Sequence, residues 1–500
     1  MYNYLTDLGM TGAGKSSCSL EKTKWWVYKN CCSVNIFRKK GRIYIVSLFH
    51  SRHQALAKAF APYSALLSSG FEQCRNYPDN TYPFRPASHF LYFAGWAAPG
   101  SYFLLHEGQA HLFLPPYTLD DIIWSGPGQN PGEAAVRSGC QVHCTDELEA
   151  FLANIDNDKL AALPLPAEGQ NLAFESLLGR IPSLDHELDR KLAKAVINLR
   201  LQADTAAQQE LRDACQLTVQ AHLAGLRALP KAKNEYDIAA AMLQVVNQAG
   251  GALSFNPIIS TSGERLHQVK LGNDLAANRL LLVDFGAENK NGWAGDITNT
   301  WPVSGRYTPV QAQIYNIVLA AHRRCVGALQ VGVDYADIHR LALETFAEGL
   351  SDYGLLQGGT VQEYLDKNVL SLFMPHGIGH LMGLDVHDME DLGDLAGYAS
   401  GRERSSLLGW KSLRLNRNLE VGLVCTIEPG LYFIAELLQH SDYVDLVRRY
   451  INPEKLTPCL EEVHGIRIER DYMVTEVGSE LLTPGMPTET TEIEEYLAQD

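Results

Sequence analysis

A chain of 500 residues is too long for one ordinary hydrophobic core, and a composition of 46% hydrophobic and 20% charged residues is typical of a globular protein with two domains. The formal net charge of −16 disfavours nucleic acids and anionic membranes as partners, because both require a clustered positive field. The 10 cysteines stand at irregular spacings without a C-x-x-C pair, and no apolar run reaches the roughly 20 residues of a membrane-spanning helix. We therefore expect a soluble, cytoplasmic protein with reduced thiols.

Residues 1–50 differ in charge from the rest of the chain. They carry 8 Lys and Arg against 2 Asp and Glu, a formal charge of +6, which leaves −22 for the remainder. Residues 9–16 match the G-x-x-x-x-G-K-S pattern of a phosphate-binding loop and include Lys15. Such a loop follows a buried strand and opens a helix, whereas residues 1–8 are a poor strand and residues 18–30 lack an amphipathic period. We expect a fortuitous match in an N-terminal extension outside the fold; a nucleotide-dependent enzyme is the alternative.

Residues 51–184 are predicted to form the smaller of two domains, of α/β type. A helix is expected over residues 51–67, and strands over residues 90–95, 101–105 and 110–114. Residues 161–184, rich in Pro, Ala and Leu, should supply the closing strands and loops of this domain.

Residues 185–490 are predicted to form a larger domain of α+β type. Apolar residues at helical spacing predict helices over residues 185–227, 236–246, 309–329 and 335–353. Apolar runs bounded by Gly, Pro or Asn predict strands over residues 280–283, 421–427 and 465–474. This mixture favours an extensive, mostly antiparallel sheet.

Two aspartates of the larger domain flank a predicted hairpin turn at residues 289–292. If the turn centres on Lys290, Asp284 and Asp296 face each other across neighbouring strands, with Cβ atoms roughly 5 Å apart. Two carboxylates at that distance repel each other unless a cation lies between them. The alternative is that each aspartate caps a turn at a strand end.

Three histidines, His376, His380 and His387, lie within a Gly-rich apolar segment. The even separation of His376 and His380 places both on one face if the segment is extended. Imidazole binds transition metals and donates hydrogen bonds to a developing oxyanion. A lone histidine would more often be structural, but three together favour a functional site.

Two glutamates, Glu428 and Glu469, each lie inside an apolar strand pattern. A glutamate that points into a core is costly unless it is paired or bound to a metal. Arg467 shares a face with Glu469 in an alternating strand, so a structural salt bridge is the alternative there. Oxygen and nitrogen ligands without a thiolate favour manganese or cobalt, with zinc as a further alternative.

Together these segments resemble the pita-bread metallopeptidases, specifically the branch of Xaa-Pro dipeptidase (prolidase) and aminopeptidase P. The resemblance extends from about residue 51 to the C-terminus, and residues 82–85 and 90–95 are similar to the small lobe of that branch. It implies a pita-bread catalytic domain over residues 185–490, preceded by an aminopeptidase P-like α/β domain over residues 51–184. It also implies a homodimer.

The resemblance implies two divalent ions, for which manganese is the expected metal. Asp284 would chelate one ion, His380 and Glu428 the other, and Asp296 and Glu469 would bridge them. The ions would lower the pKa of a water molecule that attacks the bond before proline.

Further roles follow from the same resemblance. Glu428 would take a proton from the attacking water, His387 would polarise the scissile carbonyl, and His376 would position the substrate. His267 and Arg467 would also bind substrate.

One arginine bears on the choice between a dipeptidase and an aminopeptidase. Residues 408–417 resemble the loop with which prolidases bind the free proline carboxylate, and Arg414 is the matching guanidinium, a bidentate partner for a carboxylate. A solvated basic loop is the alternative. We therefore expect hydrolysis of Xaa-Pro dipeptides, with Xaa-Pro aminopeptidase activity on longer peptides as the alternative. A metal-free creatinase-like hydrolase and a non-catalytic binding protein are remoter, because neither needs all five ligands.

Overall fold

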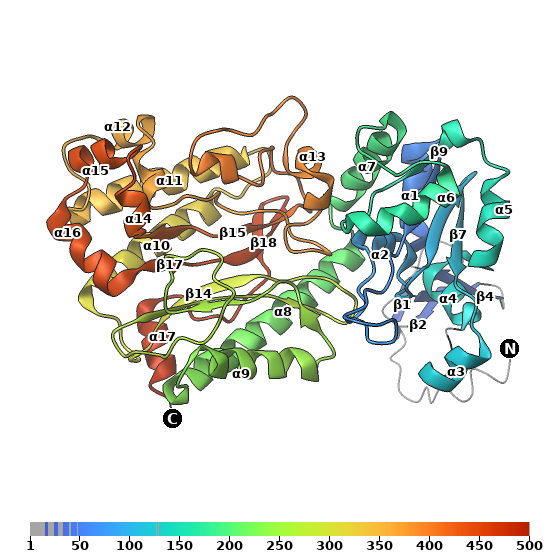
Figure 1. Cartoon of the computed structure of the whole chain (residues 1–500), viewed down its shortest axis with the longest axis horizontal. Helices are drawn as coiled ribbons and strands as arrows, with labels where there is room; N and C mark the ends of the chain where they lie inside the picture. Colours follow the sequence, from blue (N-terminus) through green and yellow to red (C-terminus); the bar gives the residue numbers. More distant parts are fainter. Residues whose placement is uncertain are drawn as a thin grey trace. The chain divides into compact units, whose positions relative to one another are not determined.

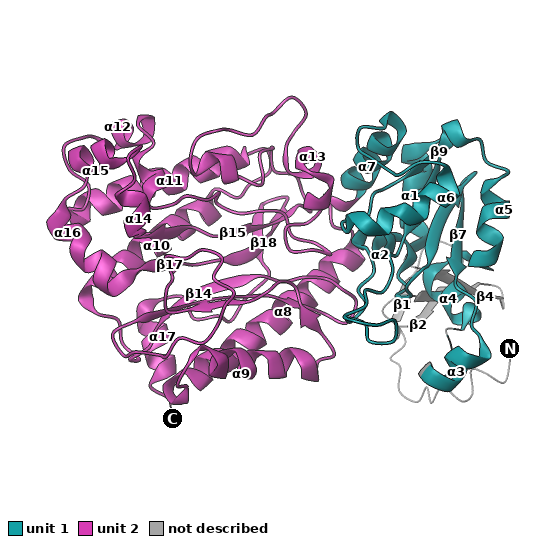
Figure 2. Cartoon of the chain, in the orientation of Figure 1, with its two compact units in different colours: residues 1–199 teal, residues 200–500 magenta. Residues whose placement is uncertain are grey.

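The computed structural model describes residues 49–126, 128 and 130–499, and, before these, the backbone of four short strands. The chain divides into two compact units, Met1–Leu199 and Arg200–Asp500 (Figure 1; Figure 2). Residues 9–15 of the phosphate-loop pattern lie outside the described residues. The four strands form an antiparallel sheet of their own, in the order β1 (Ser16–Cys18), β2 (Trp25–Tyr28), β3 (Val34–Lys39) and β4 (Arg42–Ser47).

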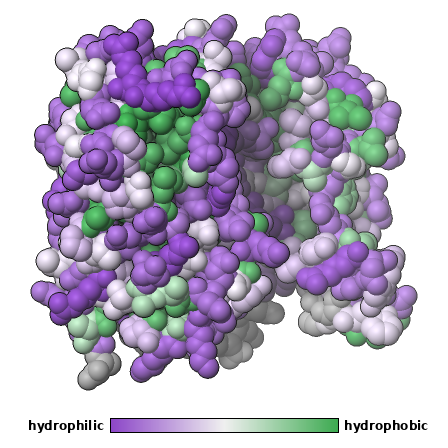
Figure 3. Space-filling model, turned by 60° about the vertical axis from the view of Figure 1, so that its left-hand side comes forward, coloured by the Kyte–Doolittle hydropathy of each residue, from purple (hydrophilic) through white to green (hydrophobic). Residues whose placement is uncertain are grey.

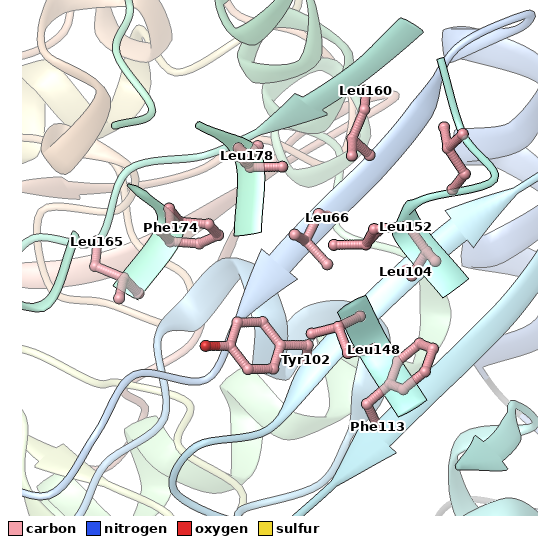
Figure 4. Close-up of a cluster of buried hydrophobic side chains, with 12 residues drawn as sticks. Leu66, Tyr102, Leu104, Phe113, Leu148, Leu152, Leu160, Leu165, Phe174 and Leu178 are labelled. Carbon is pink, nitrogen blue, oxygen red and sulfur yellow. The ribbon is translucent and has the colours of Figure 1, made fainter. Parts of the chain in front are cut away.

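Unit 1 also contains a five-stranded mixed sheet with the order β8-β7-β6-β5-β9. Its strands are β5 (Ser64–Ser68), β6 (Tyr102–His106), β7 (Gln109–Leu114), β8 (Gln141–Cys144) and β9 (Leu160–Ala162). β6 pairs antiparallel with β5 and β7, whereas β8 and β9 pair parallel with their neighbours. Leu66, Leu104 and Phe113 from this sheet pack against Leu148 and Leu152 in one buried cluster (Figure 4).

The helices of unit 1 correct two sequence predictions. They are α1 (Phe49–Phe60), α2 (Ser88–Ala94), α3 (Leu119–Ser125), α4 (Pro131–Ser138), α5 (Leu148–Leu152), α6 (Ala173–Leu178) and α7 (Glu187–Arg200). The helix predicted over residues 51–67 ends at Phe60, and β5 follows. The strand predicted over residues 90–95 is the helix α2, which ends at Gly95 in a left-handed C-cap. Burial of Phe90 and Phe93 there outweighs the β-propensity of aromatic residues.

The two compact units meet between Leu199 and Arg200, the last residue of α7, and the boundary predicted from the sequence lies at residue 184. Asp189 of α7 is fully buried, accepts the N–H of Ala162 in β9, and pairs with Arg180. A buried carboxylate that unites these three segments makes α7 part of the first unit.

Unit 2 opens with long helices, as predicted, but its antiparallel strands form several small sheets instead of the one extensive sheet expected. Its longest helices are α8 (Thr205–Ala228), α9 (Glu235–Gln248), α10 (Pro309–Gly327) and α11 (Tyr335–Tyr353). α10 begins at Pro309 because Thr308 and Gln311 form a capping box. Shorter helices are α12 (Val361–Asp366), α13 (Asp394–Gly397), α14 (Ala435–Leu438), α15 (Val444–Tyr450), α16 (Pro453–Pro458) and α17 (Thr490–Leu497).

The strands of unit 2 form four small sheets. They are β11 (Ile258–Ser260), β12 (Leu280–Phe285) and β14 (Ile297–Pro302); β15 (Val424–Ile427), β18 (Arg470–Thr475) and β19 (Gly478–Leu481); β16 (Gly430–Tyr432) and β17 (Gly465–Arg467); and β10 (Ala252–Leu253) and β13 (Ala287–Glu288). α8 lies against β13 and β14, and α10 against β15, β16 and β17 (Figure 1). β12 and β14 are buried along their whole length, which places their polar residues inside the unit.

Hydrophilic residues dominate the face drawn in Figure 3, and hydrophobic residues gather there in limited patches. Among the described residues, no helix has the length and apolar character needed to cross a bilayer.

Candidate metal centre

Asp284 lies on β12 and Asp296 directly precedes β14, the two strands of a hairpin, but the register differs from the predicted one. Asp284 pairs with Thr298, so the loop centres on Asn291 instead of Lys290. The reason is a wider turn, closed by a hydrogen bond from the Asn289 N–H to the Trp293 carbonyl. Direct opposition of the two aspartates was therefore a wrong prediction. The offset is two residues, which keeps both side chains on the same face.

Both aspartates are buried and incompletely paired. Asp284 Oδ2 accepts a hydrogen bond from Arg467 Nη2 at 2.5 Å. The backbone N–H of Asp296 donates to Asp471 Oδ2 at 2.9 Å, which fixes the start of β14. The Oδ1 atoms of Asp284 and Asp296 have no hydrogen-bond partner within the described part of the chain. A buried carboxylate oxygen without a partner indicates an ion that the surroundings are built to hold.

His380 is oriented toward these carboxylates by its backbone. Its segment runs beside β15, with the Thr426 N–H donating to the His380 carbonyl at 3.0 Å. Nδ1 lies 3.0 Å from the Leu381 carbonyl, so it carries the proton and donates. Nε2 is thereby turned to Asp296 Oδ2, at 3.5 Å, and Glu469 Oε1, at 3.6 Å. A carbonyl on one ring nitrogen and carboxylates around the other is the usual environment of a metal-binding histidine.

The two glutamates complete the cluster. The Thr298 hydroxyl donates to Glu469 Oε2 at 2.7 Å, while Glu469 Oε1 has no hydrogen bond to any described residue. Glu428 directly follows β15, where its N–H donates to the Ile378 carbonyl at 2.8 Å. Its Oε2 lies 3.8 Å from His376 Nδ1. Four carboxylates and one imidazole therefore converge from the strand ends of unit 2.

The electrostatics of the cluster favour a cation. Burial, together with the charge of Glu469, raises the pKa of Glu428 to about 8 and that of Asp296 well above its usual range. Burial lowers the pKa of the His380 imidazole, but the carboxylates of Asp296 and Glu469 beside Nε2 outweigh burial and raise this pKa well above its usual range. A divalent cation would relieve the repulsion among the carboxylates, and these donors fit manganese, cobalt or zinc.

All ten residues selected from the sequence line one cavity of about 510 Å³ in unit 2. They are His267, Asp284, Asp296, His376, His380, His387, Arg414, Glu428, Arg467 and Glu469. Phe255, Ile258 and Leu266 give the same cavity an apolar wall. Candidate metal ligands and an apolar surface in one cavity of this size suit a small peptide.

The chain matches two family descriptions. Residues 209–476 match metallopeptidase family M24, and residues 49–161 match the aminopeptidase P N-terminal domain. The chain belongs to metallopeptidase family M24. It is 32% identical over 412 residues to a probable Xaa-Pro aminopeptidase pepP of Botryotinia fuckeliana, covering 81% of this chain and 86% of the relative. A second relative of that name, from Sclerotinia sclerotiorum, is also 32% identical, over 81% of this chain and 72% of the relative.

Solved structures of aminopeptidase P are similar to this chain. The low-pH form of Escherichia coli aminopeptidase P gives a TM-score of 0.73 at 26% identity, over 90% of this chain and 97% of that one. Proline aminopeptidase P II from Yersinia pestis gives 0.72 at 26% identity, over 90% and 98%. The pita-bread catalytic domain, its aminopeptidase P-type N-terminal domain and the assignment as a metallopeptidase are thus confirmed. The names favour the aminopeptidase alternative over the dipeptidase that the sequence led us to expect.

His376 and His387, which were predicted to act on the substrate, each have a hydrogen-bonding partner within the protein. His376 Nε2 lies 2.9 Å from the Tyr432 hydroxyl, and burial lowers the pKa of His376 to about 3. His387 stacks on His380, with ring centroids 3.8 Å apart, and its Nδ1 lies 2.9 Å from Glu390 Oε1.

The two arginines are engaged within the protein. Arg467 pairs with Asp284, so the salt bridge with Glu469 that the sequence left open is not formed. Arg467 also donates to the hydroxyls of Thr298 and Tyr432, at 3.1 and 2.8 Å. Arg414 Nη1 lies 3.0 Å from a carboxylate oxygen of Glu390. Substrate binding by Arg414 and Arg467 stays a prediction.

Four supporting residues were not selected from the sequence: Thr298, Glu390, Tyr432 and Asp471. Thr298 stands two residues after Asp296, and strand alternation could have placed both on one face. Glu390 had no such signal, because it reaches His387 through a turn in which His387 has a φ of 55°. A histidine in the left-handed region is uncommon and cannot be read from the local sequence.

Proposed function

We propose that this protein is a metal-dependent Xaa-Pro aminopeptidase, which releases the first residue of peptides that carry proline second. The observation that carries this proposal is the convergence of five ligand-type side chains, three of them with unpartnered buried oxygens, in a cavity with an apolar wall. The names of the relatives support proline specificity.

Two divalent ions, with manganese as the first candidate and cobalt or zinc as alternatives, would be held by five residues. These are Asp284, Asp296, His380, Glu428 and Glu469. Bound ions supply Lewis acidity toward a carbonyl oxygen and lower the pKa of a water molecule. The unpartnered oxygens of the carboxylates support this assignment, because each offers a lone pair that no described donor uses.

The chain's own residues would hold the substrate and move protons. Glu428 lies beside His376 and lines the open cavity, so its carboxylate would accept a proton and pass it to the leaving proline nitrogen. His267 and His387 line the same cavity and would contact the peptide. Arg467, buried beside Asp284, would act mainly as a fixed counter-charge.

The environment of Arg414 favours longer peptides over dipeptides. A free proline carboxylate that binds this guanidinium would lie next to the negative charge of Glu390, which already pairs with it. Prolidase activity stays the second candidate, because Arg414 does line the cavity. A homodimer remains our expectation, to be tested by sedimentation of the full chain.

The proposal is tested on purified full-length protein that is stripped with chelator and reloaded with manganese. Two matched peptides, Ala-Pro-Ala-Ala and Ala-Ala-Ala-Ala, are incubated with both forms, and the products are identified by mass spectrometry. We expect release of the first alanine from the proline peptide alone, and only by the reloaded protein. Equal cleavage of both peptides, or none by protein shown to contain metal, would overturn the proposal.

A further inference from the structure

A loop over residues 261–273 forms one wall of the cavity. It carries Leu266, His267 and Val269, all of which line the cavity. His267 is the one candidate substrate-binding histidine on this loop. The position of the loop therefore decides where a bound peptide can meet His267.

Both ends of this loop are held by one fully buried carboxylate, that of Glu235 at the start of α9. Glu235 Oε1 accepts the Thr261 N–H at 2.9 Å and the Asn273 side-chain amide at 2.9 Å. Oε2 accepts the backbone N–H groups of Gly272 and Asn273, each at 3.0 Å. Both carboxylate oxygens of Glu235 therefore accept hydrogen bonds from the loop, and this one side chain holds the two ends of the loop together.

The middle of the loop has few other attachments. Hydrogen bonds of Gln268 and Val269 run to Arg265 and His267 inside the loop itself. Outside the loop, Arg265 pairs with Glu436 at the surface, where an ion pair contributes little. Glu264 lies 3.5 Å from His464, and a side chain at Gly263 would collide with the Gly465 carbonyl. At the other end the Asn273 carbonyl accepts the Glu235 N–H at 3.2 Å, and in the middle Leu266 packs against a small buried cluster.

The chemistry of the contact explains why a carboxylate stands there. An ionised glutamate accepts hydrogen bonds at both oxygens, whereas a glutamine has one accepting oxygen and one donating nitrogen. The donors around Glu235 are four N–H groups and, at 3.4 Å, the Thr261 hydroxyl, so the amide group of a glutamine would face N–H donors at one end of the loop. A buried charge is tolerated here because four N–H groups surround it.

We propose that Glu235 is a positioning residue, which clamps the 261–273 loop so that His267 meets the bound peptide. This inference rests on the proposed peptidase function for its kinetic consequence. Loosening the clamp should weaken binding of substrate and transition state alike. The expected result is a higher KM with an almost unchanged kcat, which is the mark of lost uniform binding.

The test compares Glu235→Gln with Asp189→Asn in full-length, manganese-loaded protein. Asp189 serves as the control, because it is equally buried and also accepts backbone N–H groups, those of Ala162 and Ser183; it lies in unit 1 and pairs in addition with Arg180. We expect Glu235→Gln to raise KM by about 10-fold, equivalent to the loss of one hydrogen bond to a charged group, with kcat within about twofold. The control variant should keep the wild-type KM.

A second measurement does not depend on activity. The exposed residues Arg265 and Lys270 are trypsin sites within the loop. Cleavage at these two sites should be faster in Glu235→Gln than in the wild type or Asp189→Asn, provided that the proteins compared have the same Tm. Wild-type KM together with wild-type cleavage in Glu235→Gln would overturn the clamp. If the wild type is inactive on peptides, the proposed function fails. The role of Glu235 is then tested by the trypsin cleavage rates alone.

Discussion

Thr298 offers the sharpest test of how the carboxylate cluster is built. Its hydroxyl donates to Glu469 at 2.7 Å and accepts from Arg467 Nε at 3.1 Å, and the side chain is fully buried. Thr298→Val keeps the shape but removes two hydrogen bonds to charged groups, each worth about 1.5 to 3 kcal/mol. We expect the free energy of unfolding to fall by about 3 kcal/mol. Affinity for manganese should fall roughly 10- to 100-fold, because Glu469 loses the partner that orients it.

Thr300 provides the matched control two residues along the same strand. It is equally buried, but its hydroxyl bonds to the backbone carbonyl and N–H of Arg467, both neutral groups. Thr300→Val should cost about 1 to 2 kcal/mol of stability and leave manganese affinity unchanged. Calorimetric titration with manganese and thermal unfolding measure both quantities. Equal manganese affinities in the wild type and Thr298→Val would refute the role of the Thr298 hydroxyl.

Two further predictions concern stability. Manganese at 100 times its dissociation constant should stabilise the folded protein by about 2.7 kcal/mol, seen as a chelator-reversible rise in Tm; an unchanged Tm would count against a specific site. Burial lowers the pKa of His53 to about 4, whereas the pKa in the unfolded chain is about 6.5. Between these two pH values the unfolded chain binds a proton that the folded protein does not. The free energy of unfolding therefore falls as the pH drops from about 6.5 to about 4. His53→Gln should lose less Tm between about pH 7 and pH 5 than the wild type does, and an identical slope in both proteins would contradict this.

The ten residues chosen from the sequence line one cavity, and several of them were chosen on simple local patterns. Asp284 and Asp296 kept their shared face although the turn was wider than expected, since an offset of two residues preserves strand alternation. His380 was found through its Gly-rich surroundings, and the glutamates through the cost of burying a charge. These signals lie in short stretches of the chain, so they can be recognised in a single sequence.

Features that depend on distant contacts could not be predicted. The sequence left open a salt bridge between Arg467 and Glu469, but Arg467 pairs with Asp284 from another sheet. The clamp by Glu235 joins residues 26 to 38 positions away. The helix α2 replaced a predicted strand because tertiary burial of aromatic side chains outweighed their local preference.

The comparison of a dipeptide with a tripeptide tests the central claim most directly. The kcat/KM of the manganese-loaded protein would be measured for Ala-Pro and for Ala-Pro-Ala, each with and without chelator. An Xaa-Pro aminopeptidase should favour the tripeptide and lose activity with chelator. Chelator-sensitive hydrolysis confined to the dipeptide would contradict the proposal and restore a role for Arg414 in binding the free proline carboxylate.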